Sequence, residues 1–214
     1  MRRNIIKIYE TLLAHYGNLH WWPAKTPYEV IVGAILTQNT SWGNVERVIA
    51  NFGEGLSPEM IEMTAVSELE VIIRPAGFFR QKAIYLKTVT EWFAGYEYDV
   101  SAVRREPLEK VRTELLSVKG VGPETADSIL LYAFGFPTFV VDAYTFRLCA
   151  RYPIDAGKTY DSVRKYFEKS LPHDAKVYNN FHALIVTNAK EHCRKKPACT
   201  ACPLNKTCKQ ITVF

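Results

Sequence analysis

Four of the five cysteines in this 214-residue chain lie within a short segment near its end. Cys193, Cys199, Cys202 and Cys208 are separated by five, two and five residues. Four thiolates in one segment supply the soft ligands that an iron–sulfur cluster or a tetrahedral zinc ion requires. Paired zinc-ribbon knuckles are absent from the pattern, but the spacing alone leaves both metals open. The sequence therefore predicts a metal site in this segment.

A glycine-rich connection at residues 118–123, Val-Lys-Gly-Val-Gly-Pro, joins two segments with helical apolar stripes. Glycine permits a tight turn and close approach of the backbone to a ligand. The unpaired N–H groups at the start of the second helix attract an anion such as phosphate. Lys119, Gly120, Val121 and Gly122 are therefore candidate binding residues. The alternative interpretation is an ordinary connection between two packed helices.

A single aspartate, Asp142, follows the apolar run 139–141 and precedes a predicted helix at 143–151. Aspartate is favoured at the N-cap of a helix, and this is the structural interpretation. A fixed carboxylate beside a hydrophobic wall can also stabilise developing positive charge or activate a water molecule. The two interpretations are compatible.

Helices must position these residues, because apolar side chains recur at helical spacing along most of the chain. Asn4 and Gly17 predict the start and end of a first helix. Capping-box patterns begin at Thr26 and Ser67. No sustained alternation of polar and apolar residues predicts a strand, so we expect an all-α fold. Further helices are predicted over 108–116, 126–133, 143–151, 161–170 and 175–190.

The composition is that of a folded protein with a mild positive charge. The chain is 48% hydrophobic and 13% aromatic, with a formal net charge of +5. This composition excludes disorder as the dominant state, because it can bury a substantial core. The N-terminal residues have no secretory pattern, and the longest apolar stretch, 129–141, is too short to span a membrane. We therefore expect neither disulfides nor membrane association.

Residues 115–147, LLSVKGVGPETADSILLYAFGFPTFVVDAYTFR, resemble the helix-hairpin-helix segment of the endonuclease III superfamily of DNA glycosylases. With the cysteine tail, the resemblance covers nearly the whole chain. It implies a two-lobed, all-α fold in which 25–135 form a helical barrel with the hairpin. It also implies a discontinuous second lobe, 1–24 and 136–214, that holds a catalytic Asp142 and a [4Fe–4S] cluster. The first cysteine gap is five residues here, whereas the family pattern has six.

Three further segments look most like the bacterial 3-methyladenine DNA glycosylases within this superfamily. They are His-Trp-Trp-Pro at 20–23, the stretch 35–42 and the stretch 74–83. The resemblance implies a base pocket lined by Trp21, Trp22, Pro23 and Trp42. A purine alkylated at N3 or N7 is cationic and stacks favourably on indole rings. Core packing is the alternative for each tryptophan.

The same resemblance implies that Gln38 and Phe78 enter the duplex and fill the gap left by a flipped nucleotide. An apolar wedge suits this task, because it replaces stacking lost when a base leaves the helix.

Glu124 stands where bifunctional members of the superfamily have a lysine, two residues after the second hairpin glycine. A carboxylate cannot form the imine that strand cleavage requires, so lyase activity is not expected. We assign Glu124 to the substrate site, and its alternative is a first-turn acid favoured by the helix dipole.

The resemblance thus implies hydrolysis of the N-glycosidic bond of an alkylated purine, such as 3-methyladenine, in damaged double-stranded DNA. We expect a monomer in the cytoplasm, associated with the nucleoid of a bacterium or archaeon. One alternative is a bifunctional endonuclease III that removes oxidised pyrimidines and cleaves the strand. Another is a non-catalytic iron–sulfur module that binds damaged DNA, and a zinc-binding structural protein is the last.

Overall fold

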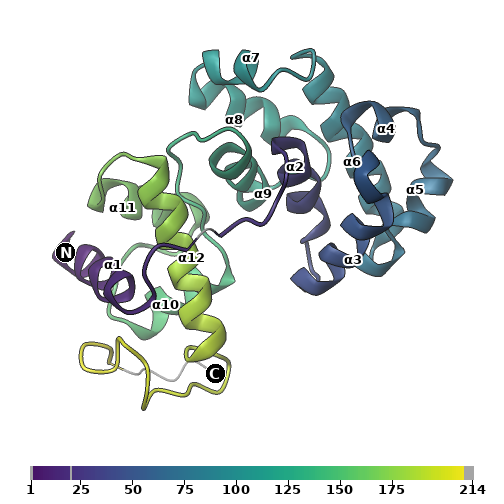
Figure 1. Cartoon of the computed structure of the whole chain (residues 1–214). Helices are drawn as coiled ribbons and strands as arrows, with labels where there is room; N and C mark the ends of the chain where they lie inside the picture. The colour runs from purple at the N-terminus through teal and green to yellow at the C-terminus, as the bar shows by residue number, and fades with distance from the viewer. Residues whose placement is uncertain (1, 20, 210–214) are drawn as a thin grey trace. The chain divides into compact units, whose positions relative to one another are not determined.

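The chain folds into two compact helical units (Figure 1). The structure is a computed structural model that describes residues 2–19 and 21–209. Unit 1 comprises Met1–Trp21 and Pro137–Phe214, and unit 2 comprises Trp22–Phe136. Every regular element in the described residues is helical, which confirms the predicted all-α class. None of these helices has the length and apolar character needed to cross a membrane.

The division between the units falls between Trp21 and Trp22. The Trp22 ring packs inside unit 2, with its centroid 5.4 Å from that of Trp42 and 4.7 Å from that of Tyr132. Gly33 lies next to the same ring, since a β-carbon there would be in ordinary van der Waals contact with the indole. These contacts hold Trp22 to unit 2.

Unit 2 is built around α2, Pro27–Leu36, which is buried at nearly every position. This helix packs against α3, α6, α9 and the π-helical segment η3. Its apolar sequence explains its central place, since a helix that is apolar on all sides must be covered on all sides. The other elements of unit 2 are α3 Trp42–Phe52, η1 Gly53–Gly55, α4 Pro58–Met63, α5 Val66–Ile72, η2 Arg74–Ala76, α6 Phe79–Ala94, α7 Val100–Arg105, α8 Leu108–Ser117, α9 Pro123–Ser128 and η3 Ile129–Ala133.

The two predicted capping boxes have different outcomes. Thr26 caps α2 as predicted, since its side chain accepts a 3.1 Å hydrogen bond from the Glu29 backbone N–H. The prediction at Ser67 is wrong, because α5 begins at Val66 and Ser67 lies inside the helix. Leu69 in α5 is fully buried. Packing of such residues stabilises a short helix without a side-chain cap.

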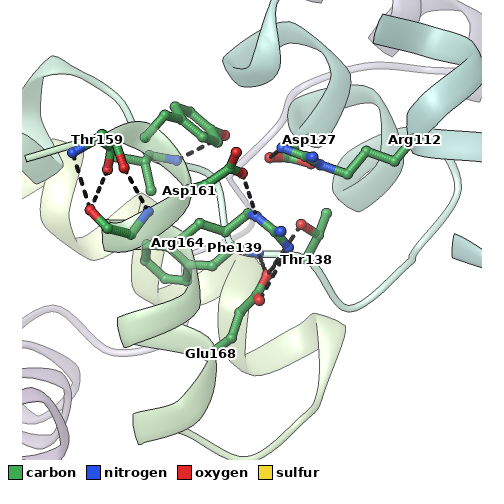
Figure 2. A network of polar contacts seen from close by, with 11 residues as sticks. Arg112, Asp127, Thr138, Phe139, Thr159, Asp161, Arg164 and Glu168 are labelled. Carbon is green, nitrogen blue, oxygen red and sulfur yellow. Dashed lines mark hydrogen bonds and ion pairs between the residues drawn. The ribbon is translucent and has the colours of Figure 1, made fainter. Parts of the chain in front are cut away.

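The hairpin helices α8 and α9 are joined by a buried ion pair (Figure 2). Arg112 Nε donates to Asp127 Oδ1 at 2.8 Å, and Arg112 Nη2 donates to Oδ2 at 3.2 Å. A bidentate pair of this kind fixes orientation as well as distance. The helix after the hairpin widens into η3, where Phe134 N donates to the carbonyl five residues earlier, at Ile129.

Unit 1 contains α1 Arg2–Tyr16, α10 Ala143–Arg151, α11 Tyr160–Ser170 and α12 Ala175–Glu191. Helix α12 packs against α1 and α10, and α1 also packs against α11. Gly17 ends α1 with a left-handed φ of 74°, as predicted, but α1 begins before Asn4. Aromatic rings fill the core, and those of Phe139 and Phe167 stack with centroids 4.5 Å apart.

Candidate active site

Asp142 lies at the N-cap of α10 in unit 1, which confirms the structural interpretation of this residue. Its Oδ1 accepts hydrogen bonds from Thr145 N at 2.7 Å and from Thr145 Oγ1 at 2.9 Å. The residue is buried, with 9% of its surface exposed. The cap therefore occupies one carboxylate oxygen and leaves Oδ2 to other contacts.

The extended segment that leads to Asp142 is held by α11 (Figure 2). Glu168 Oε1 accepts from Phe139 N at 3.0 Å and from Thr138 Oγ1 at 3.3 Å. Arg164 contacts Glu168 at 3.1 Å and Asp161 at 3.5 Å, and Figure 2 shows its guanidinium between the two carboxylates. These bonds fix the backbone just before Asp142.

His182 in α12 is the neighbour of the second carboxylate oxygen. Its Nε2 lies 3.4 Å from Asp142 Oδ2, and only 6% of the residue is exposed. Sequence reasoning missed this residue. A usable signal existed, because His182 interrupts the otherwise apolar run from Phe181 to Val186 in a predicted buried helix.

The surroundings of Asp142 favour its ionised form. Burial raises the pKa of this carboxyl, but the neighbouring His182 and the two hydrogen bonds from Thr145 lower it by more. The net direction is a pKa below the ordinary value of 3.8. Asp142 is therefore a buried carboxylate at neutral pH, available to interact with a developing positive charge.

The hairpin in unit 2 depends on Gly120. Its φ of 88° lies in the left-handed region, and a β-carbon there would collide with the ring of Tyr85. Thr88 Oγ1 also donates to the Lys119 carbonyl at 3.1 Å. The turn is therefore fastened to α6. Gly122 occupies the N-cap of α9, and Glu124 is exposed in the first turn of that helix.

The two residues assigned to the duplex have different environments within unit 2. Phe78 is 63% exposed and has a left-handed backbone with φ of 45°. The Gln38 side chain instead contacts the hairpin, since Nε2 donates to the Gly120 carbonyl at 2.9 Å and to Thr125 Oγ1 at 3.0 Å. Lys82 links the loops that carry them, because Nζ donates at 2.9 Å to the carbonyls of both Leu36 and Ala76.

The aromatic residues assigned to the base pocket divide between the units. Trp22 and Trp42 meet edge to face in unit 2, where Tyr132, which sequence reasoning missed, joins them. Pro23 is exposed. Trp21 belongs to unit 1, where Lys190 Nζ lies 5.3 Å from its ring centroid. Each unit therefore holds its own part of the predicted aromatic set.

The four tail cysteines, Cys193, Cys199, Cys202 and Cys208, line one pocket in unit 1 that is partly open to solvent. Buried Arg151 forms one wall, with Nη1 donating to Cys193 Sγ at 3.3 Å and to the Arg194 carbonyl at 2.6 Å. Burial raises the pKa of Cys202, and the three other cysteines raise it further.

A set of four thiolates needs a compensating cation, so this donor set fits a group bound by four cysteines. Within residues 2–19 and 21–209, no three His, Cys, Asp or Glu side chains are grouped closely enough to hold a single metal ion.

Comparisons with known proteins agree with this arrangement. Residues 32–173 match the family described as the HhH-GPD superfamily base excision DNA repair protein. The chain is 49% identical over 210 residues to a Methanocaldococcus jannaschii protein named provisionally as a DNA repair glycosylase, with 95% of each chain covered. It is 28% identical to Endonuclease III of Haemophilus influenzae, over 86% of this chain and 84% of that one.

Solved structures show the same fold. The 3-methyladenine DNA glycosylase of H. pylori bound to 1,N6-ethenoadenine superposes with a TM-score of 0.76 at 27% identity, over 89% of this chain and 97% of that one. An Endonuclease III–DNA covalent intermediate superposes with a TM-score of 0.83 at 23% identity, over 98% and 96%. The predicted two-lobed endonuclease III-like fold is therefore confirmed, and the chain belongs to the HhH-GPD superfamily of base excision DNA repair proteins.

Proposed function

We propose that this protein is a monofunctional DNA glycosylase that removes an alkylated purine from double-stranded DNA. The observation that carries the proposal is the buried, ionised carboxylate of Asp142, with Oδ1 used by the helix cap and Oδ2 outside it. Breaking an N-glycosidic bond develops positive charge on the sugar. A fixed carboxylate stabilises that charge or activates the attacking water.

The chemistry of the substrate matches a site built around an ionised acid. A purine alkylated at N3 or N7 carries positive charge and leaves readily, so it needs little proton donation from the enzyme. The paired rings of Trp22 and Trp42 support a pocket for such a base, because indole faces attract cations. We assign Trp21, Pro23 and Glu124 to substrate binding on the same proposal.

DNA binding is proposed for the hairpin residues 119–122 and for the two loops that carry Gln38 and Phe78. The exposed ring of Phe78 supports its role as a wedge, because an apolar side chain in water gains by entering a gap in the base stack. Gln38 reaches the duplex in this proposal only after its bonds to Gly120 and Thr125 break. We propose that the enzyme acts as a monomer.

We propose that the four cysteines hold a [4Fe–4S] cluster rather than zinc. Their place around one pocket, with Arg151 donating to Cys193 Sγ, supports a thiolate-bound group. When bound, such a group supplies a cross-link for the tail segment. Ultraviolet–visible absorption and iron and zinc analysis of the purified protein test this assignment, and one equivalent of zinc without iron would overturn it.

Lyase activity is not part of the proposed function, because Glu124 replaces the amine that would attack the sugar. The test uses duplexes with one alkylated purine or one oxidised pyrimidine, with and without alkaline treatment. We expect strand cleavage of the alkylated duplex only after alkali, and no product trapped by borohydride. Nicking of the oxidised duplex without alkali would instead establish a bifunctional endonuclease III. Damage-specific binding without base release would establish a non-catalytic module.

A further inference from the structure

The two oxygens of the Asp142 carboxylate have different partners. Thr145 supplies two donors to Oδ1, both within 3 Å, and both come from the helix that Asp142 caps. His182 faces Oδ2 from α12, a helix that packs against α10. Thr145 therefore holds Oδ1 at the cap, whereas His182 acts on Oδ2, the oxygen outside the cap.

We propose that His182 is a positioning residue for base excision, which holds Asp142 as a carboxylate with Oδ2 directed away from the cap. This inference rests on the proposed function for its catalytic meaning. The interaction itself is a property of α10 and α12 and is measurable without substrate.

The distance explains how His182 acts without competing for the reacting oxygen. A strong N–H···O hydrogen bond spans about 2.7–3.2 Å. The separation of 3.4 Å between Nε2 and Oδ2 is longer, so the contact is chiefly electrostatic. It stabilises negative charge on Oδ2, and it leaves lone pairs of that oxygen to a water molecule or a sugar.

A buried carboxylate needs such a neighbour. Burial alone favours the protonated acid, and a protonated Asp142 could neither stabilise a cation nor activate water. Thr145 from α10 and His182 from α12 are the groups that lower the pKa of Asp142 against the effect of burial. Replacing His182 removes the charge and keeps the cap, so the two contributions are separable.

The direction in which the rate of base release changes with pH follows from the pKa of Asp142. Because the folded-state pKa of Asp142 is depressed, its active carboxylate persists above that pKa and is lost as the pH falls through it. A variant without the charge of His182 has a higher Asp142 pKa. The acid limb of its rate profile therefore moves to higher pH.

The experiment compares wild type, His182→Gln and His182→Asn, with His173→Gln as the matched control because His173 is exposed. Base release from the alkylated duplex is measured under single-turnover conditions across pH. We expect the acid limb of both His182 variants to rise by about 1 pH unit, with His173→Gln unchanged. Binding to a duplex with an abasic site should be unchanged. An unmoved acid limb, or an equal loss of rate at every pH, would overturn the proposal.

A second measurement needs no substrate and separates this proposal from the proposed function. Carbon-13 labelling of aspartate carboxyls, with Asp142→Asn to assign the signal, follows the titration of Asp142 directly. The Asp142 signal should titrate at higher pH in His182→Gln than in wild type, and equal titration would overturn the pairing. If the wild type releases no damaged base, the proposed function is wrong. The titration still shows whether His182 lowers the pKa of Asp142.

Both substitutions at His182 could disturb folding, so a third comparison leaves His182 in place. Asn caps helices as well as Asp, so Asp142→Asn should keep the fold. The imidazole resonances of His182 should shift in Asp142→Asn and stay constant in the control Asp155→Asn, because Asp155 is an exposed aspartate outside the helices. Unchanged His182 resonances in Asp142→Asn would overturn the proposal.

Discussion

Among the residues that the structure describes, each unit buries one aspartate, and the two aspartates have different partners. In the hairpin of unit 2, Asp127 is fully buried and the Arg112 guanidinium bonds both of its oxygens. In unit 1, Asp142 gives one oxygen to a helix cap, and its other oxygen lies 3.4 Å from His182. A carboxylate with both oxygens bonded to a guanidinium locks two helices together. An ionised carboxylate with one oxygen in the helix cap and the other outside it can interact with a substrate.

The largest effect on stability is expected from breaking the locked pair. Arg112→Met removes the two hydrogen bonds that the buried Asp127 receives from the guanidinium, and breaking a buried ion pair in this way destabilises a protein by about 3–5 kcal/mol. Urea or thermal unfolding measures the decrease in the free energy of unfolding. The double variant Arg112→Met/Asp127→Leu should recover most of it, because both charges are then absent. A single variant as stable as wild type would contradict the role of Asp127 as a structural lock.

A smaller loss is expected from the hairpin turn beside that lock. Gly120→Ala adds a β-carbon at a left-handed position and against the Tyr85 ring. We expect a destabilisation of about 1–3 kcal/mol and weaker duplex binding. Gly122→Ala is the matched control for stability, because nothing lies within 4 Å of its added β-carbon. Equal effects of the two substitutions would show that the close approach at Gly120 is unimportant.

The stability of unit 1 should depend on pH through Asp142. The depressed pKa of Asp142 means that its carboxylate stabilises the fold above the ordinary value of 3.8 and loses this contribution as the pH falls further. Asp142→Asn should remove that contribution and flatten the acid side of the stability curve. Unfolding followed between pH 6 and pH 2, in steps of about half a unit, measures the change. An identical acid slope in wild type and variant would contradict the ionised state of Asp142.

The smallest effect on stability is expected at Phe78. Its ring is exposed and its backbone is left-handed, so Phe78→Gly relieves strain and removes no core contact. We expect stability within about 0.5 kcal/mol of wild type. Duplex binding should fall about tenfold, since a wedge contributes on the scale of base unstacking. Unchanged binding to a lesion-containing duplex would remove Phe78 from the proposed DNA surface.

Local signals predicted the framework of both units. The capping pattern at Thr26, the helix stop at Gly17 and the cap at Asp142 depend on neighbours in the chain, and each is confirmed. The hairpin could also be predicted, because glycine and proline within a few residues are typical of a tight turn between two helices. The capping box predicted at Ser67 is wrong, because packing of Leu69 outweighs the local preference of serine for the N-cap.

Long-range contacts account for what sequence reasoning missed. His182 lies forty positions beyond Asp142, and only the packing of α12 on α10 brings them together. Tyr132 meets Trp22 for the same reason, through packing in unit 2. The contact of the Gln38 side chain with Gly120, eighty-two positions further along the chain, is a third long-range pairing. No local pattern encodes such pairings.

The most direct test compares the structural Asp127 with the proposed catalytic Asp142. Base release and thermal stability are measured together in Asp142→Asn and Asp127→Asn. We predict that Asp142→Asn loses base release from an alkylated duplex by about 10³-fold while its melting temperature stays above that of Asp127→Asn. Asp127→Asn should keep its rate of base release at a temperature where it is folded, but melt well below wild type. Full base release by Asp142→Asn would contradict the account.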